Sequence, residues 1–265
     1  MNRKIIGIGL LAATLAAIWA AFVLFTREKV PPVQAPEAAP PAEAPATPTP
    51  QIDYKAAIEG ARPGEWTMDF EAAKALAAET GLPLLLNFTG SDWCGWCRMM
   101  DKQVFSQEAW KTYAKEHFVL VWIDFPREKA LVPEKFVERN TKLAQAFEVG
   151  GFPTFVLLDA DGQTRLGQTG ASRDATPERF IAALEEILLA SDKSVAALRE
   201  TMTDDQQAEL DAAREAQQLA RQKLDDWLRT EPEQTEENVA LQQGLLEEIA
   251  HADEAVLQLL RSAVK

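Results

Sequence analysis

Cysteine and histidine are both scarce in this chain, and their scarcity limits the kinds of site it can build. The 265 residues include 2 cysteines and 2 histidines. A protein that relies on disulfides as staples carries more cysteines, at wider spacing. A zinc site needs about four ligands, and only His117 and His251 are available to join Cys94 and Cys97. Half of a zinc site and a purely structural disulfide are therefore the less favoured interpretations of the pair.

Basic residues are also too few to balance the acidic ones. The chain has 27 lysines and arginines against 41 aspartates and glutamates, a formal net charge of −14. Nucleic-acid binding needs a basic face to meet phosphate, so this balance argues against it. Residues 191–265 hold 8 basic and 17 acidic residues. We interpret them as a solvated acidic helical surface, with an acidic partner-binding face as the alternative.

One long stretch contains no charged residue at all. Residues 5–25 are apolar and about as long as a helix needs to cross a bilayer, and Arg3 and Lys4 precede them in a short tail, residues 1–4. The run is too long for a cleaved signal peptide and no good small-x-small site follows it. An uncleaved membrane anchor is predicted, with a removed signal as the alternative. Basic residues flank both ends, so orientation rests on the simpler topology, which puts the bulk of the chain outside the cytoplasm.

The anchor is followed by a proline-rich spacer and two folded parts. Residues 26–50 hold 8 of the 15 prolines, a composition typical of an extended linker. Residues 51–190 are predicted to form an α/β domain and residues 191–265 an acidic helical hairpin.

Hydrophobic patterns and turn signals predict the elements of the α/β domain. Helices are expected over residues 69–80, 94–105, 106–117, 134–147 and 177–189, and strands over 84–88, 118–123, 155–158 and 164–168. This order predicts a central sheet covered by helices on both faces. In the last part, Thr203 and Gln206 fit a capping box before an apolar stripe. Gln217 and Asp253 interrupt the two stripes, so a hairpin of helices is expected rather than a long coiled coil.

The two cysteines stand two residues apart, directly after an apolar strand and a short loop. A thiolate attacks disulfides and a thiol does not, so the protein must favour the anion. Cys94 is expected at a helix start, where free backbone N–H groups and the helix dipole stabilise negative charge. Cys97, one turn later, is placed to resolve the mixed disulfide. Trp93 and Trp96 are either ordinary packing residues or an apolar docking surface for an extended partner.

These residues together resemble the thioredoxin superfamily, and most of all its bacterial membrane-anchored or exported thioredoxin-like proteins. The resemblance covers about residues 66–190. It rests on strand 84–88, the Trp-Cys-Gly-Trp-Cys motif of residues 93–97, Asp124 after the second strand, residues 151–154 and Gly170. It implies a thioredoxin-like fold, a mixed sheet with helices on both faces.

The same resemblance implies roles for residues around the motif. Pro153 is expected to have a cis peptide bond with Phe152 and to face the cysteines as part of the catalytic site with Cys94 and Cys97. Substrate-binding contacts are expected from Trp93, Gly95, Trp96 and Phe152. A cis proline has no N–H to donate, and it would leave the Phe152 backbone free to pair with an extended substrate.

Three positions depart from the family pattern. Gly95-Trp96 replaces the usual Gly-Pro between the cysteines, so the redox potential cannot be copied from the general reductases. Asn87 stands where a buried aspartate is common, and Leu120 where a lysine often accompanies it. An asparagine cannot accept and return a proton, so proton transfer at Cys97 needs water or another group. Asp92 is a candidate for that role and equally for capping its loop.

The predicted function is that of a membrane-tethered thiol-disulfide oxidoreductase. It would exchange disulfides with protein partners through Cys94 and Cys97, be recycled by a redox partner, and need no metal or organic cofactor. Reduction of the partners is favoured over their oxidation on the resemblance alone. The alternative is a non-catalytic binding or scaffold protein that uses the acidic hairpin. Signatures of a peroxidase are not visible in the sequence.

Overall fold

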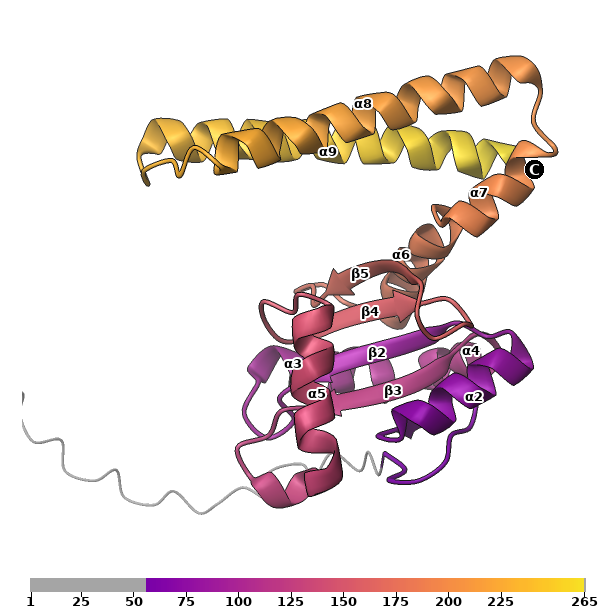
Figure 1. Cartoon of the computed structure of the whole chain (residues 1–265), viewed down its shortest axis with the longest axis vertical. Helices are drawn as coiled ribbons and strands as arrows, with labels where there is room; N and C mark the ends of the chain where they lie inside the picture. The colour runs from indigo at the N-terminus through magenta and orange to yellow at the C-terminus, as the bar shows by residue number, and fades with distance from the viewer. Residues whose placement is uncertain (1–55, 265) are drawn as a thin grey trace, which may run out of the picture. The chain divides into compact units, whose positions relative to one another are not determined.

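Two strands that are buried at every residue lie in the interior of a five-stranded mixed sheet in the computed structural model, which describes residues 56–264 (Figure 1). The strands are β1 (Trp66–Thr67), β2 (Leu84–Thr89), β3 (Val119–Asp124), β4 (Thr154–Leu158) and β5 (Arg165–Gly170), in the spatial order β1-β3-β2-β4-β5. β2 and β3 pair in parallel, with Thr89 opposite Asp124. A parallel pair needs a long crossover, which here is helical. The two-residue strand β1 was not predicted.

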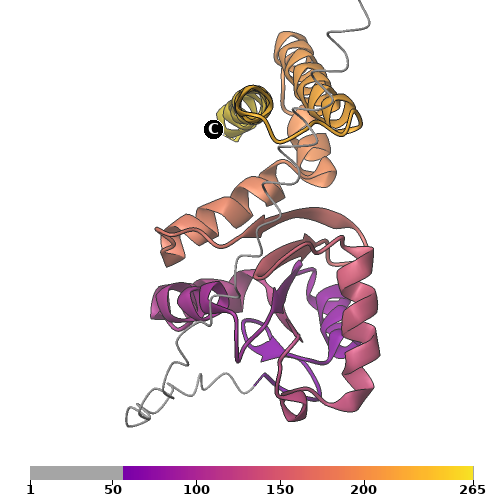
Figure 2. The ribbon, with the colours of Figure 1, turned by 90° about the vertical axis from the view of Figure 1, so that its left-hand side faces the viewer.

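Helices cover both faces of the sheet (Figure 2). The helical segments of this part are α2 (Phe70–Thr80), α3 (Gly95–Met100), η1 (Asp101–Phe105), α4 (Glu108–His117), η2 (Lys129–Leu131), α5 (Glu134–Ala146) and α6 (Pro177–Leu189). Side chains of α3, η1, α4 and α6 share one core cluster with one face of the sheet. Side chains of α2 and α5 pack against the other face. The predicted mixed sheet with two helical layers is confirmed.

The helix boundaries follow from local capping chemistry. The Asp69 carboxylate accepts a hydrogen bond from the N–H of Ala72, and Gly81 ends α2 in the left-handed region at φ 73°. Thr176 caps α6 in the same way, with Pro177 in its first turn. The predicted helix over residues 94–105 begins where expected, but its second half, η1, has the wider π-helical turn.

Residues 191–264 form three helices where two were predicted: α7 (Asp192–Arg199), α8 (Asp204–Leu228) and α9 (Glu236–Ala263). The capping box of Thr203 and Gln206 is present, and α8 and α9 pair as the expected hairpin. The additional helix α7 is capped by Ser191, whose hydroxyl accepts from the N–H of Ser194. Its Val195 is buried in a small core with Leu210 and side chains of α9.

The small core of the C-terminal helices also includes Leu189 and Ala190, and the Arg261 guanidinium on α9 pairs with Glu186 on α6 at 2.5 Å. The end of α6 therefore packs with the helices that follow it. The domain division at residue 190 stays a prediction.

The predicted anchor, residues 5–25, and the predicted linker, residues 26–50, lie outside the described residues. In the part of the chain that is described, every helix is too short or too polar to cross a bilayer.

Candidate functional site

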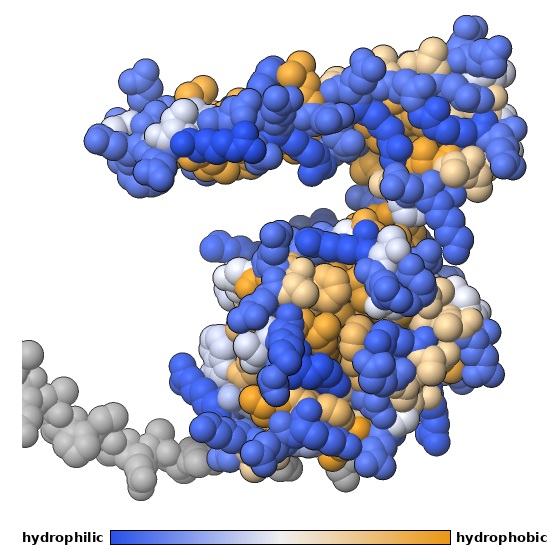
Figure 3. Space-filling view, in the orientation of Figure 1, coloured by the Kyte–Doolittle hydropathy of each residue, from blue (hydrophilic) through white to orange (hydrophobic). Residues whose placement is uncertain are grey.

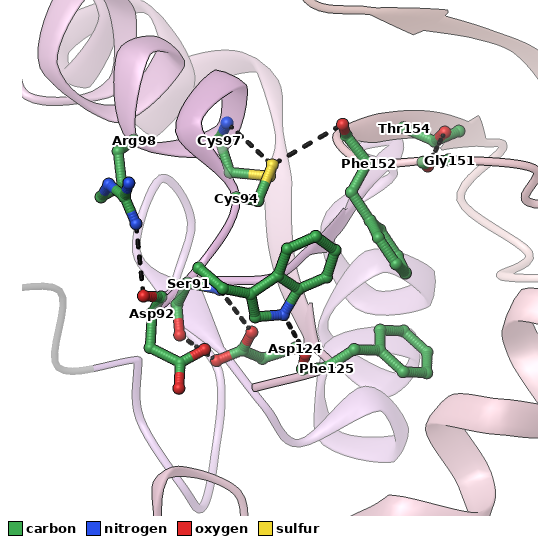
Figure 4. Close-up of a disulfide and its surroundings, with 11 residues drawn as sticks. Ser91, Asp92, Cys94, Cys97, Arg98, Asp124, Phe125, Gly151, Phe152 and Thr154 are labelled. Carbon is green, nitrogen blue, oxygen red and sulfur yellow. Dashed lines mark hydrogen bonds between the residues drawn. A yellow bond between two sulfur atoms is a disulfide. The ribbon is translucent and has the colours of Figure 1, made fainter. Parts of the chain in front are cut away.

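The two cysteines form a disulfide at the beginning of α3 (Figure 4). Their Cα atoms lie 5.2 Å apart, and Cys94 is the N-cap residue of the helix. The N–H of Cys97 donates a hydrogen bond to Sγ of Cys94 at 3.1 Å. An N-cap side chain normally satisfies a free amide of the first turn, and here a sulfur takes that place. After reduction the same amide and the helix dipole would stabilise a thiolate on Cys94.

Both cysteines of the disulfide are buried, Cys97 slightly more than Cys94. Cys94 is 6% exposed and Cys97 is 2% exposed. Gly95 and Trp96, which separate them, are both exposed. Cys94 therefore lies slightly nearer the exposed side of the pair, and Cys97 lies deeper; the nucleophilic role of Cys94 stays a prediction.

An aromatic surface borders the disulfide. Trp93 and Trp96 are 36% and 44% exposed. The indole N–H of Trp93 donates to the carbonyl of Phe125 at 2.8 Å, and its ring meets the ring of Phe152 edge to face at 5.8 Å between centroids. Trp93 is thus fixed by a hydrogen bond and by a ring contact, while part of its side chain remains exposed to solvent. Trp96 projects further into solvent and is the more available of the two for a partner.

Phe152 lies opposite the disulfide (Figure 4), and Pro153 follows it on the loop that leads into β4. The peptide bond between them is cis, as the resemblance implied. The carbonyl oxygen of Phe152 lies 3.6 Å from Sγ of Cys94. The loop around the cis bond thus places a backbone carbonyl within contact of the Cys94 sulfur. Catalytic and substrate-binding roles for these residues remain proposals.

Two acidic residues fix the loop that carries the cysteines. The Asp124 carboxylate accepts hydrogen bonds from the N–H of Ser91 at 3.0 Å and from its hydroxyl at 2.6 Å. The Asp92 carboxylate accepts from the N–H groups of Arg127 and Glu128 at 3.0 and 2.8 Å. Burial acts to raise the pKa of Asp92, but these backbone bonds outweigh it and the pKa is lowered. Asp92 therefore has the loop-capping role that was one of its two predicted roles.

A buried carboxyl group that was not predicted belongs to the helical segment that follows the disulfide. Asp101, one helical turn after Cys97, is 3% exposed. Burial, together with the nearby Asp124 carboxylate, raises the pKa of Asp101 to about 7. Burial also raises the pKa of Asp124, although the Ser91 hydrogen bonds oppose that shift. The four-residue spacing from Cys97 was a signal in the sequence, but the burial of Asp101 depends on the tertiary packing.

A cavity of about 790 Å³ continues from the aromatic surface. Phe125 lines it and also contacts Phe152, with ring centroids 5.2 Å apart. Val132 and Val137 contribute apolar wall. The cavity has room for an apolar side chain. Among the described residues, no three His, Cys, Asp or Glu side chains gather as a metal site would require.

Comparison with known families identifies the domain that holds this site. Residues 70–188 match the family model described as a thioredoxin-like domain. The chain contains a thioredoxin-like domain. The matched segment includes the disulfide, the cis proline and all of the strands except β1.

Two curated relatives come from Chlamydia pneumoniae. The chain is 41% identical over 81 residues to "Disulfide bond reductase DsbH", a match that covers 31% of this chain and 48% of the relative. It is 29% identical over 107 residues to "Thioredoxin-related protein DsbJ", covering 40% of this chain and 30% of the relative. The chain thus spans half or less of the length of the curated relatives it matches.

Solved structures include similar chains. One is titled "DsbH Oxidoreductase", with 29% identity, a TM-score of 0.43, and coverage of 49% of this chain and 86% of that chain. Another is a thioredoxin from Thermus thermophilus, with 25% identity, a TM-score of 0.38, and coverage of 50% and 90%.

Proposed function

We propose that this protein is a membrane-tethered thiol-disulfide oxidoreductase that reduces disulfides in protein partners through Cys94 and Cys97. The observation that carries the proposal is the position of the disulfide, at a helix N-terminus with the Phe152 carbonyl 3.6 Å from the Cys94 sulfur. This arrangement joins a sulfur at the first turn of a helix to a backbone edge with which an extended polypeptide could pair. The name of the relative DsbH, a disulfide bond reductase, supports the direction of electron flow.

The reaction begins from the reduced pair. The Cys94 thiolate attacks one sulfur of the partner's disulfide, forming a mixed disulfide and releasing the partner's other sulfur as a thiolate. Cys97 loses its thiol proton and attacks Sγ of Cys94. The bond between Cys94 and the partner breaks, the second partner sulfur leaves, and the disulfide between Cys94 and Cys97 forms. Two electrons pass to the partner, and a separate dithiol protein must return them.

Partner binding would use the aromatic surface around the disulfide. Trp96 and Gly95 lie on the exposed side of the pair, and Trp93 and Phe152 form an edge-to-face pair beside it. An extended segment of the partner would run along Phe152 and Pro153, with apolar side chains on the indole rings.

Membrane tethering and an extracytoplasmic site belong to the same proposal. Residues 5–25 supply the anchor and residues 26–50 the spacer. In an oxidising compartment, disulfides of exported proteins are the available substrates. The pair would then need reducing equivalents delivered from a recycling partner.

Trapping of the mixed disulfide tests the proposal. A Cys97→Ser variant of the full-length protein should accumulate covalent adducts with protein partners that dissolve on addition of dithiothreitol, whereas Cys94→Ser should not. The wild-type protein should also reduce insulin with dithiothreitol as the electron source. Absence of both adducts and turnover would refute the oxidoreductase.

A second candidate, a non-catalytic scaffold, is favoured by one observation on the hairpin. Five large apolar side chains of the hairpin are each about half exposed: Leu219 and Leu228 on α8, and Val239, Leu241 and Leu246 on α9. Figure 3 shows hydrophobic patches on this hairpin among a mostly hydrophilic surface. Partner capture that survives Cys94→Ala, without insulin reduction by the wild type, would favour the scaffold.

A further inference from the structure

The thiol-disulfide exchange proposed above requires a group that takes the proton of Cys97. Asn87 occupies the position at which a buried aspartate is common in the family pattern. The amide of Asn87 cannot act as a base at neutral pH. Cys97 is 2% exposed, so bulk water has little access to its thiol. Another buried side chain must therefore lie close to the Cys97 sulfur.

Side chains of β2 point alternately to the two faces of the sheet, and this pattern identifies the face on which such a group must lie. Leu84, Leu86 and Phe88 belong to the core on one side of the sheet, whereas Leu85 belongs to the core shared with α3 and η1. Side chains two residues apart share a face. Asn87 and Thr89 therefore follow Leu85 onto the face covered by the helix that carries the cysteines.

Strand β3 contributes to the same layer. Trp122 belongs to the core shared with α3 and η1. Asp124 follows two residues later and therefore lies on the same face of the sheet. Thr89 and Asp124 are direct neighbours across the two strands. A buried polar layer of Asn87, Thr89 and Asp124 thus lies between the ends of the central strands and the helix that carries Cys97.

Asp101 enters this layer from the helix side. It follows Cys97 by four residues, and its backbone N–H donates to the carbonyl of Cys97. Residues four apart on a helix have Cβ atoms about 6 Å apart, so their side chains are neighbours that can meet directly or through one water. Both side chains are buried, Cys97 at 2% and Asp101 at 3% exposure. Cys97 and Asp101 therefore share the buried face of one helical turn.

We propose that Asp101 is the proton acceptor for Cys97 in the step that resolves the mixed disulfide. The Cys97 S–H bond breaks and its proton passes to the Asp101 carboxylate. The Cys97 sulfur then attacks Sγ of Cys94, and the partner's sulfur leaves with the electron pair of the broken bond. When the pair is reduced again, Asp101 returns the proton to the Cys97 sulfur. The inference depends on the proposed exchange reaction and adds the residue that moves its proton.

The surroundings of Asp101 match this task. Its pKa, raised to about 7 by burial and by the Asp124 carboxylate, lets it accept and release a proton near neutral pH. Asp124 is the titratable group that faces it from the sheet. The other helices packed on this layer, α4 and α6, contribute apolar rings such as Trp110 and Phe180. The oxygens Asn87 Oδ1 and Thr89 Oγ1 are buried acceptors that lack a hydrogen-bond donor among the described residues, and a protonated carboxyl is a donor.

The test separates the two chemical steps in the full-length protein. Reduced protein mixed with an excess of the aromatic disulfide 5,5′-dithiobis(2-nitrobenzoate) releases one coloured thiolate when Cys94 attacks. It releases a second when Cys97 resolves the adduct. Both signals come from this pair, because the chain has 2 cysteines. In stopped-flow traces, Asp101→Asn should leave the first phase within about twofold and slow the second phase about 10- to 100-fold at pH 7.

The pH profile distinguishes proton transfer from structural damage. The difference between Asp101→Asn and wild type should narrow at alkaline pH, where ionisation of the Cys97 thiol depends less on a protein base. Asp124→Asn removes the like charge and should move the pH dependence of the second phase to lower pH, while keeping that phase fast at pH 7. Asp205→Asn, on the exposed surface of α8, is the matched control and should match wild type in both phases.

Three outcomes would overturn the assignment: an unchanged second phase in Asp101→Asn, an equal slowing of both phases at every pH, or a loss of the pH dependence in Asp124→Asn alone. Wild-type protein gives a test that needs no variant. Its second phase should accelerate through a pKa near 7. Acceleration only above about pH 8.5, the value of a free thiol, would contradict the proposal. Absence of the first phase would instead refute the exchange reaction itself.

Discussion

The backbone N–H of Cys97 lies 3.1 Å from Sγ of Cys94 and donates a hydrogen bond to it. One cysteine thus supplies, through its main chain, part of the positive environment of the other. The relationship depends on the two-residue spacing, because the N-cap side chain of a helix meets the amide three residues later. It links the sequence motif to a physical reason for the reactivity of Cys94.

Trp93 is expected to stabilise the loop around the disulfide, because its indole N–H bonds to the Phe125 carbonyl at 2.8 Å. Trp93→Phe keeps an aromatic ring beside Phe152 but removes that donor. The free energy of unfolding should fall by about 1 kcal/mol, measured by urea denaturation. Trp96→Phe, at a side chain that is 44% exposed, is the control and should change stability by less than about 0.5 kcal/mol. Equal effects of the two variants would contradict this account of the loop.

Two glycines of the site should respond differently to an added methyl group. A Cβ on Gly90 would lie 2.4 Å from the indole ring of Trp93, whereas a Cβ on Gly95 would have no atom within 4 Å. Gly90→Ala should therefore destabilise the protein by about 1–3 kcal/mol. Gly95→Ala should leave stability unchanged or slightly raised. Thermal unfolding of both variants measures this, and a neutral Gly90→Ala would show that Trp93 can move aside freely.

Stability should depend on pH through Asp101. Its pKa is about 7 in the folded chain and 3.8 in the reference state, so between these values the folded protein holds a proton that the unfolded chain has lost. The free energy of unfolding therefore falls as pH rises from 4 to 7. Asp101→Asn removes this contribution, and its stability relative to wild type should increase over that range by up to roughly 4 kcal/mol. Denaturation at pH 4.5, 6 and 7.5 tests this. A constant difference across the three would place the pKa of Asp101 at its ordinary value.

The polar interruption of the hairpin is expected to stabilise it locally. The Asp253 carboxylate accepts hydrogen bonds from Gln217 at 2.9 Å and from Arg221 at 2.8 Å across α8 and α9. Asp253→Ala should speed amide exchange in both helices, corresponding to about 1 kcal/mol, and leave insulin reduction unchanged. The exposed Asp225→Ala is the control. If insulin reduction fell with Asp253→Ala, the hairpin would contribute to catalysis.

The sequence was sufficient to predict most of the α/β elements because their signals are local. Asp69 and Gly81 bound α2, and Thr176 with Pro177 begins α6, as expected. The cysteine motif and the cis Phe152–Pro153 bond were also predictable, the latter from the resemblance. Gln217 and Asp253 were recognised as interruptions of the stripes, but their mutual bond depends on how the two helices align.

The remaining features depend on contacts between distant segments. The two residues of β1 carry too little pattern to predict, and they form a strand because β3 offers a free edge. The helix α7 has only 8 residues, so its sequence gives a weak periodic signal. The local sequence predicts an exposed helical position for Asp101. Its burial, and the nearby Asp124 carboxylate, result from packing of the helical segment against the sheet.

Titration of the Cys94 thiol tests the central claim most directly. In reduced full-length Cys97→Ser protein, the rate of alkylation by iodoacetamide should rise with pH through the pKa of Cys94. The account predicts a pKa clearly below the free-thiol value of about 8.5, because the first turn of α3 stabilises the anion. A pKa at or above 8.5 would contradict it.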